Sequence, residues 1–328
     1  MARLYSFCAT KRRNLAYARF LDRFDDSTAI SLAEVVAFGA RLMRRANLHA
    51  HFFDDNTLLA NAQYLTCFSL NLAYGNTHDG LVLKRAQAVS ILALFERRIA
   101  TRMPVEYLTK QAFYMGRTFY VNADVLVPRS LMSSRFKDFL ESTNWQNYRV
   151  LDLCCGSGCI GITLALLNPK IKVDLVDISL AALEVAQMNI DLHALSARVQ
   201  CLHSDLFTNL HTKYDLIITN PPYVSLGDYQ RVPLEFKREP QIALASGTTG
   251  LDIIQQIIAQ APNYLNPQGR LIAEVGYPAA KLLKKQYKNL PLKWLAYRSP
   301  KPAKTWFEHW LKPLLAMDCV LIWDNLFI

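Results

Sequence analysis

The spacing of apolar residues changes about one third of the way along the chain. Before that point apolar positions recur at the spacing of amphipathic helices. The clearest run spans residues 81–100, and Met103-Pro104 is expected to end it. Its apolar face carries Ala88, Ile91, Leu92, Phe95 and Ile99, opposite Lys84, Arg85, Gln87 and Arg97. The pattern predicts a small helical N-terminal domain over residues 1–104.

Residues 105–130 follow a different pattern. Two short runs, 112–114 and 118–121, flank Met115-Gly116-Arg117. Short runs rich in aromatic and β-branched residues around a glycine are typical of two strands joined by a tight turn. We expect this β-hairpin to link the helical domain to the rest of the chain.

Beyond Tyr148, short β-branched runs alternate with segments of helical period. Strands are expected at residues 149–153, 172–177, 199–202, 214–219 and 270–275. Helices are expected at residues 159–167, 179–189, 251–264 and 278–288. Repeated βα units predict an α/β fold, an open and mostly parallel Rossmann-like sheet with helices on both faces. This domain is expected to occupy residues 131–328.

Composition and charge suit two folded domains with an anionic partner. Of 328 residues, 52% are hydrophobic, and the formal net charge is +10. Nucleic acid or a ribonucleoprotein would complement this charge, although solubility alone explains it equally well. No run of about 18 apolar residues occurs, so no membrane span is expected.

The cysteines and the N-terminus bear on the compartment. The 7 cysteines lack the paired spacing of a zinc site, so we expect no metal, and unpaired thiols favour a reducing cytoplasm. Residues 1–20 hold several basic residues and no acidic ones. A short basic helix is the preferred interpretation, and an organellar transit peptide is the alternative.

A glycine-rich turn follows the first strand of the α/β domain. In such sheets, ligands bind at the carboxyl ends of the strands. Glycines there allow a tight turn and a close approach of the backbone to a ligand. The candidate ligand contacts in and before this turn are Asp152, Cys154, Cys155, Gly156, Ser157 and Gly158.

Two further acids follow the next two strands. Asp177 stands about 20 residues after the turn, where a carboxylate can accept both hydroxyls of a ribose. Asp205 can accept from an adenine amino group, with Leu206 or Phe207 against the ring, unless it serves only as a helix cap. No phosphate-binding Gly-Lys-Ser/Thr occurs, so the ligand carries a ribose but need not carry phosphates. S-adenosylmethionine meets that description.

Asn220-Pro221-Pro222-Tyr223 follows a predicted buried strand. The Asn220 side-chain oxygen and the Pro221 carbonyl can accept two N–H groups of one planar amino group. Pro222 restricts Pro221 to an extended conformation and so directs its carbonyl, and the Tyr223 ring offers a flat surface. An ordinary turn at the end of a strand is the alternative interpretation.

These motifs together resemble protein-glutamine methyltransferases of the HemK/PrmB type. The resemblance extends to Arg102–Thr109, Val125-Leu126-Val127-Pro128-Arg129-Ser130 and Arg238-Glu239-Pro240, and Val-Pro-Arg-Ser is similar to the PrmB branch. That branch methylates a glutamine of the third large-subunit ribosomal protein. The resemblance implies a class I methyltransferase fold and S-adenosylmethionine as methyl donor. It also implies Asn220, Pro221 and Tyr223 as catalytic residues, with Asn220 also beside the cofactor.

The same resemblance implies the partners of the chain. They are a large-subunit ribosomal protein or its assembly intermediate. The basic charge of the N-terminal domain adds the expectation of contact with ribosomal RNA. It also implies that the N-terminal domain recognises the substrate and that the enzyme is cytoplasmic.

Two segments depart from the family pattern. After Ser130 the family continues with Pro-Ile-Gly-Glu, and here about four residues are missing before Ser133, Ser134 and Arg135. An aromatic and basic insertion, residues 298–318, precedes Cys319-Val320-Leu321-Ile322-Trp323, which could still form the final strand. Two rivals stay open. The Asn-Pro-Pro-Tyr motif is shared with adenine-N6 methyltransferases of DNA or RNA, and the shortened segment favours a ribosome-associated relic of weakened activity.

Overall fold

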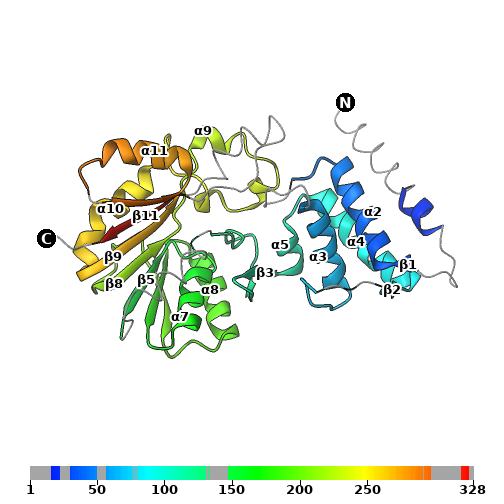
Figure 1. Cartoon of the computed structure of the whole chain (residues 1–328), viewed down its shortest axis with the longest axis horizontal. Coiled ribbons are helices and arrows are strands. Elements are labelled where there is room, and N and C mark those ends of the chain that lie inside the picture. The colour runs from blue at the N-terminus through cyan, green and yellow to red at the C-terminus, as the bar shows by residue number, and fades with distance from the viewer. Residues whose placement is uncertain are drawn as a thin grey trace. The chain divides into compact units, whose positions relative to one another are not determined.

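The computed structural model divides into two compact units, Met1–Thr109 and Lys110–Ile328 (Figure 1). Each unit has its own hydrophobic core. No helix of the described residues is long and apolar enough to cross a membrane. The structure describes residues 16–22, 30–49, 57–76, 78, 80–130, 132, 147–290, 292–296 and 319–324.

The N-terminal unit is built from helices around a small two-stranded pairing. Its elements are β1 (Ile30–Ser31), α2 (Leu32–Arg45), α3 (Thr57–Ser69), β2 (Val82–Leu83), α4 (Arg85–Thr101) and α5 (Val105–Thr109). Ser31 begins α2, because its hydroxyl accepts the Glu34 N–H while the Glu34 carboxylate accepts the Ser31 N–H. This reciprocal pair is a capping box.

The helix predicted over residues 81–100 is confirmed, with a different start. All five residues of its predicted apolar face are buried. The helix begins at Arg85 rather than at residue 81, because Val82–Leu83 pairs with Ile30–Ser31. It ends at Thr101, and the backbone of the following Arg102, its C-cap, is left-handed with φ 56°.

The predicted hairpin forms as β3 (Gln111–Tyr114) and β4 (Arg117–Tyr120). Residues 105–109, which the sequence placed with the hairpin, instead form helix α5 of the N-terminal unit. The hairpin belongs to the second unit, where Asn189 of α8 (Leu180–Leu192) holds it. The Asn189 amide exchanges two hydrogen bonds with the Tyr120 backbone, of 2.7 and 3.0 Å, and donates a third to the Ser157 carbonyl.

The second unit contains a seven-stranded sheet in the order β10-β11-β9-β8-β5-β6-β7. Five neighbouring strands are parallel, and β10 and β11 add to the β9 edge in antiparallel pairing. The strands are β5 (Arg149–Leu153), β6 (Lys172–Asp177), β7 (Val199–His203), β8 (Tyr214–Thr219), β9 (Leu265–Val275), β10 (Leu292–Ala296) and β11 (Cys319–Asp324).

The predicted Rossmann-like α/β fold is therefore confirmed, including the final strand expected at residues 319–323. The main difference is β9, which begins at Leu265, five residues before the expected start. Its pairing with β8 shifts between Tyr214 and Leu216, so the extra residues precede a bulge. The insertion at residues 298–318 and the segment 133–146 lie outside the described residues.

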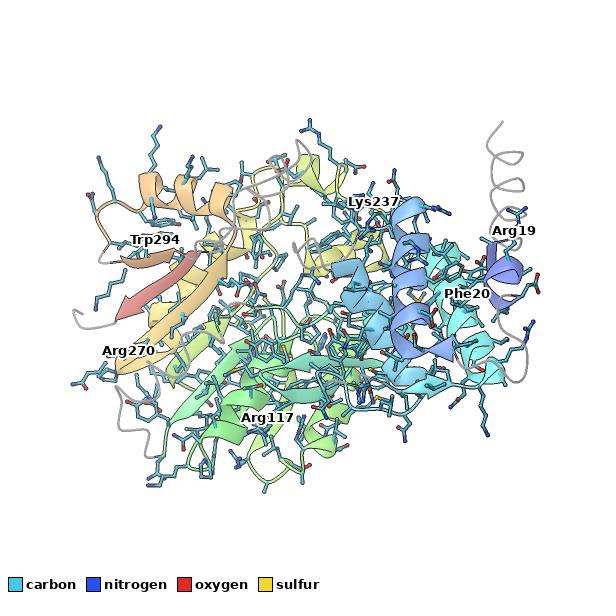
Figure 2. The ribbon with its side chains drawn as sticks, turned by 45° about the vertical axis from the view of Figure 1, so that its right-hand side comes forward. Arg19, Phe20, Arg117, Lys237, Arg270 and Trp294 are labelled. Atoms are coloured by element: carbon cyan, nitrogen blue, oxygen red, sulfur yellow. The ribbon has the colours of Figure 1, made fainter. Side chains whose placement is uncertain are left out.

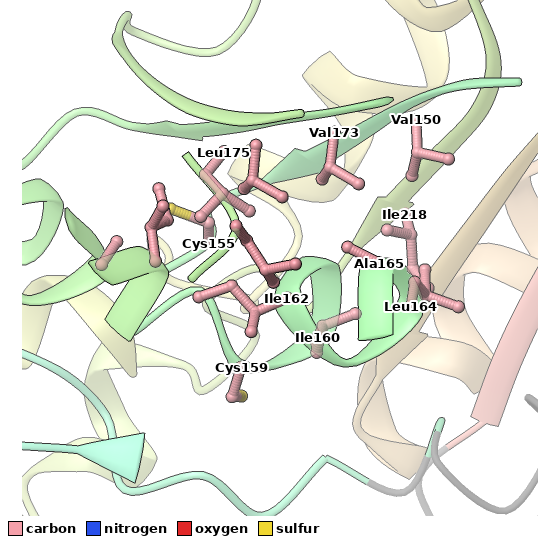
Figure 3. Close-up of a cluster of buried hydrophobic side chains, with 14 of the residues drawn as sticks. Val150, Cys155, Cys159, Ile160, Ile162, Leu164, Ala165, Val173, Leu175 and Ile218 are labelled. Carbon is pink, nitrogen blue, oxygen red and sulfur yellow. The ribbon is translucent and has the colours of Figure 1, made fainter. Parts of the chain in front are cut away.

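Helices cover both faces of the sheet, and each face has its own core. On one face α7 (Cys159–Leu167) and α8 pack against β5, β6 and β8, with Ile162, Leu164 and Leu175 fully buried (Figure 3). On the other face α10 (Asp252–Tyr264) and α11 (Tyr277–Gln286) bury Ile254, Ile257 and Leu283. The short elements α9 (Leu226–Tyr229), η1 (Phe236–Arg238) and η2 (Gln241–Ala243) lie between β8 and α10.

Asn189→Ala should destabilise the second unit. Asn189 is fully buried, and the change leaves the Tyr120 N–H and two carbonyls, which are buried or partly buried, without this partner. Each unsatisfied buried group costs roughly 1–3 kcal/mol. Chemical denaturation should show a loss of about 2 kcal/mol or more. Gln187→Ala, on the exposed side of the same helix, is the control, and equal losses in both variants would contradict this account of the hairpin.

Candidate active site

The site lies where the strand order of the sheet reverses. Strand β5 pairs with β6 on one side and with β8 on the other, both in parallel. The chain runs outward from β5 to β6 and β7 and then returns to β8, which makes this a topological switch point. The carboxyl ends of β5, β6 and β8 therefore open into one cavity.

The glycine-rich turn after β5 forms one wall of this cavity. Cys154, Gly156 and Gly158 all have positive φ, of 59°, 53° and 74°. The turn is tied to β6, because the Cys155 N–H donates to the Val176 carbonyl and the Gly156 N–H donates to the Asp177 carboxylate. Cys154, Cys155, Gly156 and Ser157 line the cavity. Gly158 does not, since it packs against Leu175 at the start of α7.

Asp152 lies beneath the turn rather than on the cavity surface. Its side chain is fully buried, and one carboxylate oxygen accepts the Gly161 N–H of α7 at 2.8 Å. The other oxygen has no hydrogen-bond partner among the described residues. Burial raises the pKa of this carboxyl to about 7, with the nearby Asp177 adding to the rise. Asp152 therefore holds the turn and the helix together and is not among the residues that line the cavity.

Asp177 lines the cavity at the end of β6. Its two oxygens accept the N–H groups of Ser179 and Gly156, each at 2.9 Å. Burial raises the pKa of the Asp177 carboxyl, and these backbone donors oppose the rise. The side chain is part-exposed and lines the cavity, so it retains lone pairs for a ligand.

Asp205 and Leu206 line the cavity beside β7. The Asp205 side chain is exposed, and no hydrogen bond to its carboxylate is formed by the described residues. It therefore does not cap a helix and is available to a ligand. Phe207 is different from the expectation, because it is fully buried and stacks on Tyr264 at 4.6 Å. Only Leu206 of this pair can lie against a bound ring.

Asn220 follows β8 and lines the cavity with an unpaired acceptor. Its side-chain oxygen is buried and has no hydrogen-bond partner among the described residues. The preceding Thr219 hydroxyl donates to the Leu153 carbonyl at 2.7 Å, which fixes the end of β8 against β5. A buried acceptor without a partner is rare in folded proteins and suggests that a ligand or substrate supplies the donor.

Pro221 and Tyr223 are not among the residues that line the cavity. Pro221 is buried. Tyr223 is half-buried and packs on a small core formed by Val224, Tyr229, Val232, Phe236 and Leu244. The chain beyond it is fixed by a bridge between Val224 and Ala245. Gly250 has positive φ, and a side chain there would collide with the Tyr223 carbonyl, so the region after the tetrapeptide is tightly constrained.

A second wall of the cavity, residues 124–130, was not assigned a role from the sequence. The buried Glu239 carboxylate holds it, accepting from the Arg129 guanidinium at 2.8 Å and from the Val127 N–H at 3.2 Å. The Ser130 hydroxyl donates to the buried Glu274 carboxylate of β9 at 2.6 Å. The motifs Val-Pro-Arg-Ser and Arg-Glu-Pro are therefore two halves of one structural contact. Their separation of about 110 residues hid this pairing in the sequence.

The cysteines of the turn are not arranged for metal binding or nucleophilic chemistry. Burial raises the pKa of the Cys154 and Cys155 thiols and raises that of Cys159 to about 12. Protonated thiols are poor nucleophiles and poor ligands. In the part of the chain that the structure describes, no three His, Cys, Asp or Glu side chains gather as a metal site.

Comparisons with known proteins show that this chain is similar to methyltransferases. Residues 133–247 match the family model described as Methyltransferase small domain. The "Ribosomal protein uL3 glutamine methyltransferase" of Neisseria gonorrhoeae is 39% identical over 274 residues, which cover 81% of this chain and 90% of that protein. The protein of the same name from Bradyrhizobium diazoefficiens is 38% identical over 280 residues, covering 81% and 86% respectively.

Asp152 should make the free energy of unfolding decrease as pH rises. Its pKa is about 7 in the folded protein and near 3.8 when unfolded, so the folded state binds the proton more tightly. Stability should therefore fall as pH rises from about 4 to about 7. Asp152→Asn cannot ionise, so its melting temperature relative to the unchanged protein should rise between pH 5 and pH 8. A constant difference across this range would contradict the assignment, and Asp191→Asn on the surface is the control for charge removal.

Proposed function

Because the chain belongs to the family of ribosomal protein uL3 glutamine methyltransferases, we propose that it methylates the side-chain amide nitrogen of a glutamine in uL3. The observation that carries the proposal is the buried Asn220 oxygen, which lines the cavity without a partner among the described residues. A glutamine amide supplies the N–H donor that this oxygen lacks. The adenine amino group, which is the methyl acceptor in the rival hypothesis, would also supply an N–H donor. The identity of the methyl acceptor must therefore be tested directly.

The methyl donor in this proposal is S-adenosylmethionine. Asp177 would accept from the ribose hydroxyls, Asp205 from the adenine amino group, and Leu206 would lie against the ring. The glycine turn at residues 154–157 leaves room for the ligand, since a side chain at Gly156 would meet no atom within 4 Å. The bound cofactor supplies a methyl group that its sulfonium already activates, so the protein's task is to prepare the nitrogen.

The task is demanding because the lone pair of an amide nitrogen is delocalised into its carbonyl. Asn220 and the Pro221 carbonyl would accept the two N–H groups and favour a pyramidal nitrogen. Tyr223, which does not line the cavity in this structure, would have to turn toward it to pack on the amide plane. Orientation of this kind can contribute roughly 7–11 kcal/mol to lowering the barrier. The residues around Asn220 hold the amide and need not remove a proton first, because the extra proton becomes acidic once the nitrogen is methylated.

The partner would be uL3 itself or the large-subunit assembly intermediate that carries it. The excess of positive charge, +10 over the chain, would suit contact with ribosomal RNA. This assignment would also place the enzyme where ribosomes are assembled, in agreement with the expected cytoplasmic location.

The direct test uses radiolabelled S-adenosylmethionine and ribosomal particles from a strain without the corresponding methyltransferase. Label on uL3, mapped by mass spectrometry to a glutamine, would support the proposal. Label on nucleic acid would support the adenine-N6 alternative. No label on either, with the cofactor bound normally, would support a relic of weakened activity.

Asp177→Ala should weaken S-adenosylmethionine binding about tenfold or more, because roughly 1–3 kcal/mol is lost for each unsatisfied polar group. Asp205→Ala should also weaken binding and is the cleaner variant, since no described hydrogen bond depends on its carboxylate. Calorimetry measures both affinities, with Asp191→Ala as the control. Unchanged affinity in both site variants would rule out this cofactor placement.

Asn220→Ala should lower turnover by about a hundredfold or more, which is typical when a reacting group loses its orientation. Tyr223→Phe should have a milder effect, because the ring and not the hydroxyl would contact the amide. Steady-state kinetics with uL3 as methyl acceptor measures both. Near-native turnover in Asn220→Ala would show that its oxygen does not hold the acceptor.

A further inference from the structure

Among the residues of the N-terminal unit that the structure describes, the exposed charges are almost all positive. Within the described part of Met1–Thr109, the exposed acidic side chain is Asp22 alone. The exposed basic side chains are Arg19, Arg41, Arg44, Arg45, Lys84 and Arg97. Figure 2 shows Arg19 directed away from this unit, next to the inward-facing Phe20. Such an asymmetry is the electrostatic footprint of a polyanion-binding domain.

Three of these arginines gather on the last two turns of α2. Arg41, Arg44 and Arg45 are spaced by three and four residues, so they share the outward side of the helix, opposite its buried face. The structure gives none of the three an acidic partner among the described residues. We refer to Arg41, Arg44 and Arg45 as the α2 arginine cluster.

Other arginines of the unit show what a structural role looks like. Arg98 is fully buried and donates to the His49 carbonyl at 2.9 Å. Arg85 donates to the Leu21 carbonyl at 2.7 Å. Arg102 donates to the Ala46 and Asn47 carbonyls at the end of α2. Because Arg102 already serves that helix end, the α2 arginine cluster is not needed to cap it.

Two aromatic rings lie beneath Arg41 of the α2 arginine cluster. The Arg41 guanidinium lies 5.9 Å from the centre of the Phe38 ring, and Phe38 stacks on Phe20 at 4.1 Å with the planes at 14°. This stacking fixes one arginine of the cluster on a rigid support. Arginine rather than lysine dominates the exposed cations, and the planar guanidinium matches phosphate geometry with two parallel hydrogen bonds.

We propose that the α2 arginine cluster binds the phosphate backbone of large-subunit ribosomal RNA. This inference rests on the proposed function, and it gives the N-terminal unit a defined role. RNA held by α2 would keep the enzyme on the assembly intermediate whose uL3 it methylates. The cluster would then raise the rate on RNA-bound uL3 while leaving the chemistry at Asn220 unaltered.

The binding test compares the full-length protein with a triple variant, Arg41→Gln, Arg44→Gln and Arg45→Gln. Each lost phosphate contact should reduce the slope of log affinity against log salt by roughly 0.7–0.9, or about 2 for the three together. Affinity for a large-subunit ribosomal RNA transcript should fall at least tenfold in 100 mM salt. The control is Lys281→Gln, Lys284→Gln and Lys285→Gln on α11, which removes the same charge from an exposed helix of the other unit.

Equal losses in the two triple variants would overturn the proposal, because the effect would then be that of net charge alone. An unchanged salt slope in the α2 variant would also overturn it. Vesicles of anionic lipid are the second probe. Retention by vesicles as tight as by the RNA, with the same dependence on the cluster, would overturn the choice of RNA as occupant.

The activity test separates this inference from the proposed function. The α2 triple variant should methylate free uL3 at the native rate and RNA-bound uL3 at a kcat/KM reduced about tenfold. If the unchanged protein methylates neither form, the proposed function fails. If it methylates both and the variant matches it on both, the proposed function stands and the RNA-binding role of α2 fails. Equal thermal unfolding of the two proteins would show that the comparison is between folded states.

Discussion

The site depends on the parallel pairing of β5 with both β6 and β8. That pairing brings three carboxyl ends, each followed by a polar residue or turn, to one edge of the sheet. Cross-strand hydrogen bonds beyond the ladder then fix the edge itself, from Gly156 to Asp177 and from Thr219 to Leu153. A shift of one residue in either pairing would turn every side chain of the strand to the other face. The cavity geometry is therefore set by the same hydrogen bonds that order the core.

Two buried carboxylates fix the position of the second wall of the cavity, residues 124–130. Glu239 and Glu274 reach residues 127–130 from segments far along the chain. Removing one partner of a buried pair leaves an uncompensated charge or donor, so such contacts enforce one arrangement more than they add net stability. The wall is held this way up to Ser130, where the family pattern is interrupted. The residue that precedes the shortened segment, Ser130, is therefore held to the sheet by its hydrogen bond to Glu274.

Much of this fold could be predicted because its strands and helices have strong local patterns. The runs at 149–153, 172–177 and 214–219 are short and mostly apolar, and each forms the predicted strand. The start of α4 could not be predicted. Val82–Leu83 fits the helical pattern of the sequence, but it forms a strand because it pairs with Ile30–Ser31. Tertiary pairing over such a distance leaves no trace in local periodicity.

In the candidate site, local sequence patterns also could not predict which individual side chains face the cavity. The sequence places Asp152, Asp177 and Asp205 alike, each at the end of a strand or shortly after one. The fold separates them, with Asp152 buried under the turn, Asp177 shared between turn and cavity, and Asp205 exposed. Leu206 and Phe207 are separated in the same way by a single residue. Which of two neighbours faces a ligand depends on the backbone, and Leu206 has a positive φ of 47° that no local pattern predicts.

The Asn220 oxygen, which has no hydrogen-bond partner among the described residues, has a cost in free energy that the rest of the domain must offset. A buried acceptor without a donor costs roughly 1–3 kcal/mol. The strand that leads to Asn220 is well packed, since Ile217 of β8 and Leu271 and Ala273 of the neighbouring β9 are fully buried. The cost is recovered only when a donor enters the cavity, so it favours the bound state over the free one. An acceptor of this kind selects N–H groups, and it orients them without any change in the protonation of the protein.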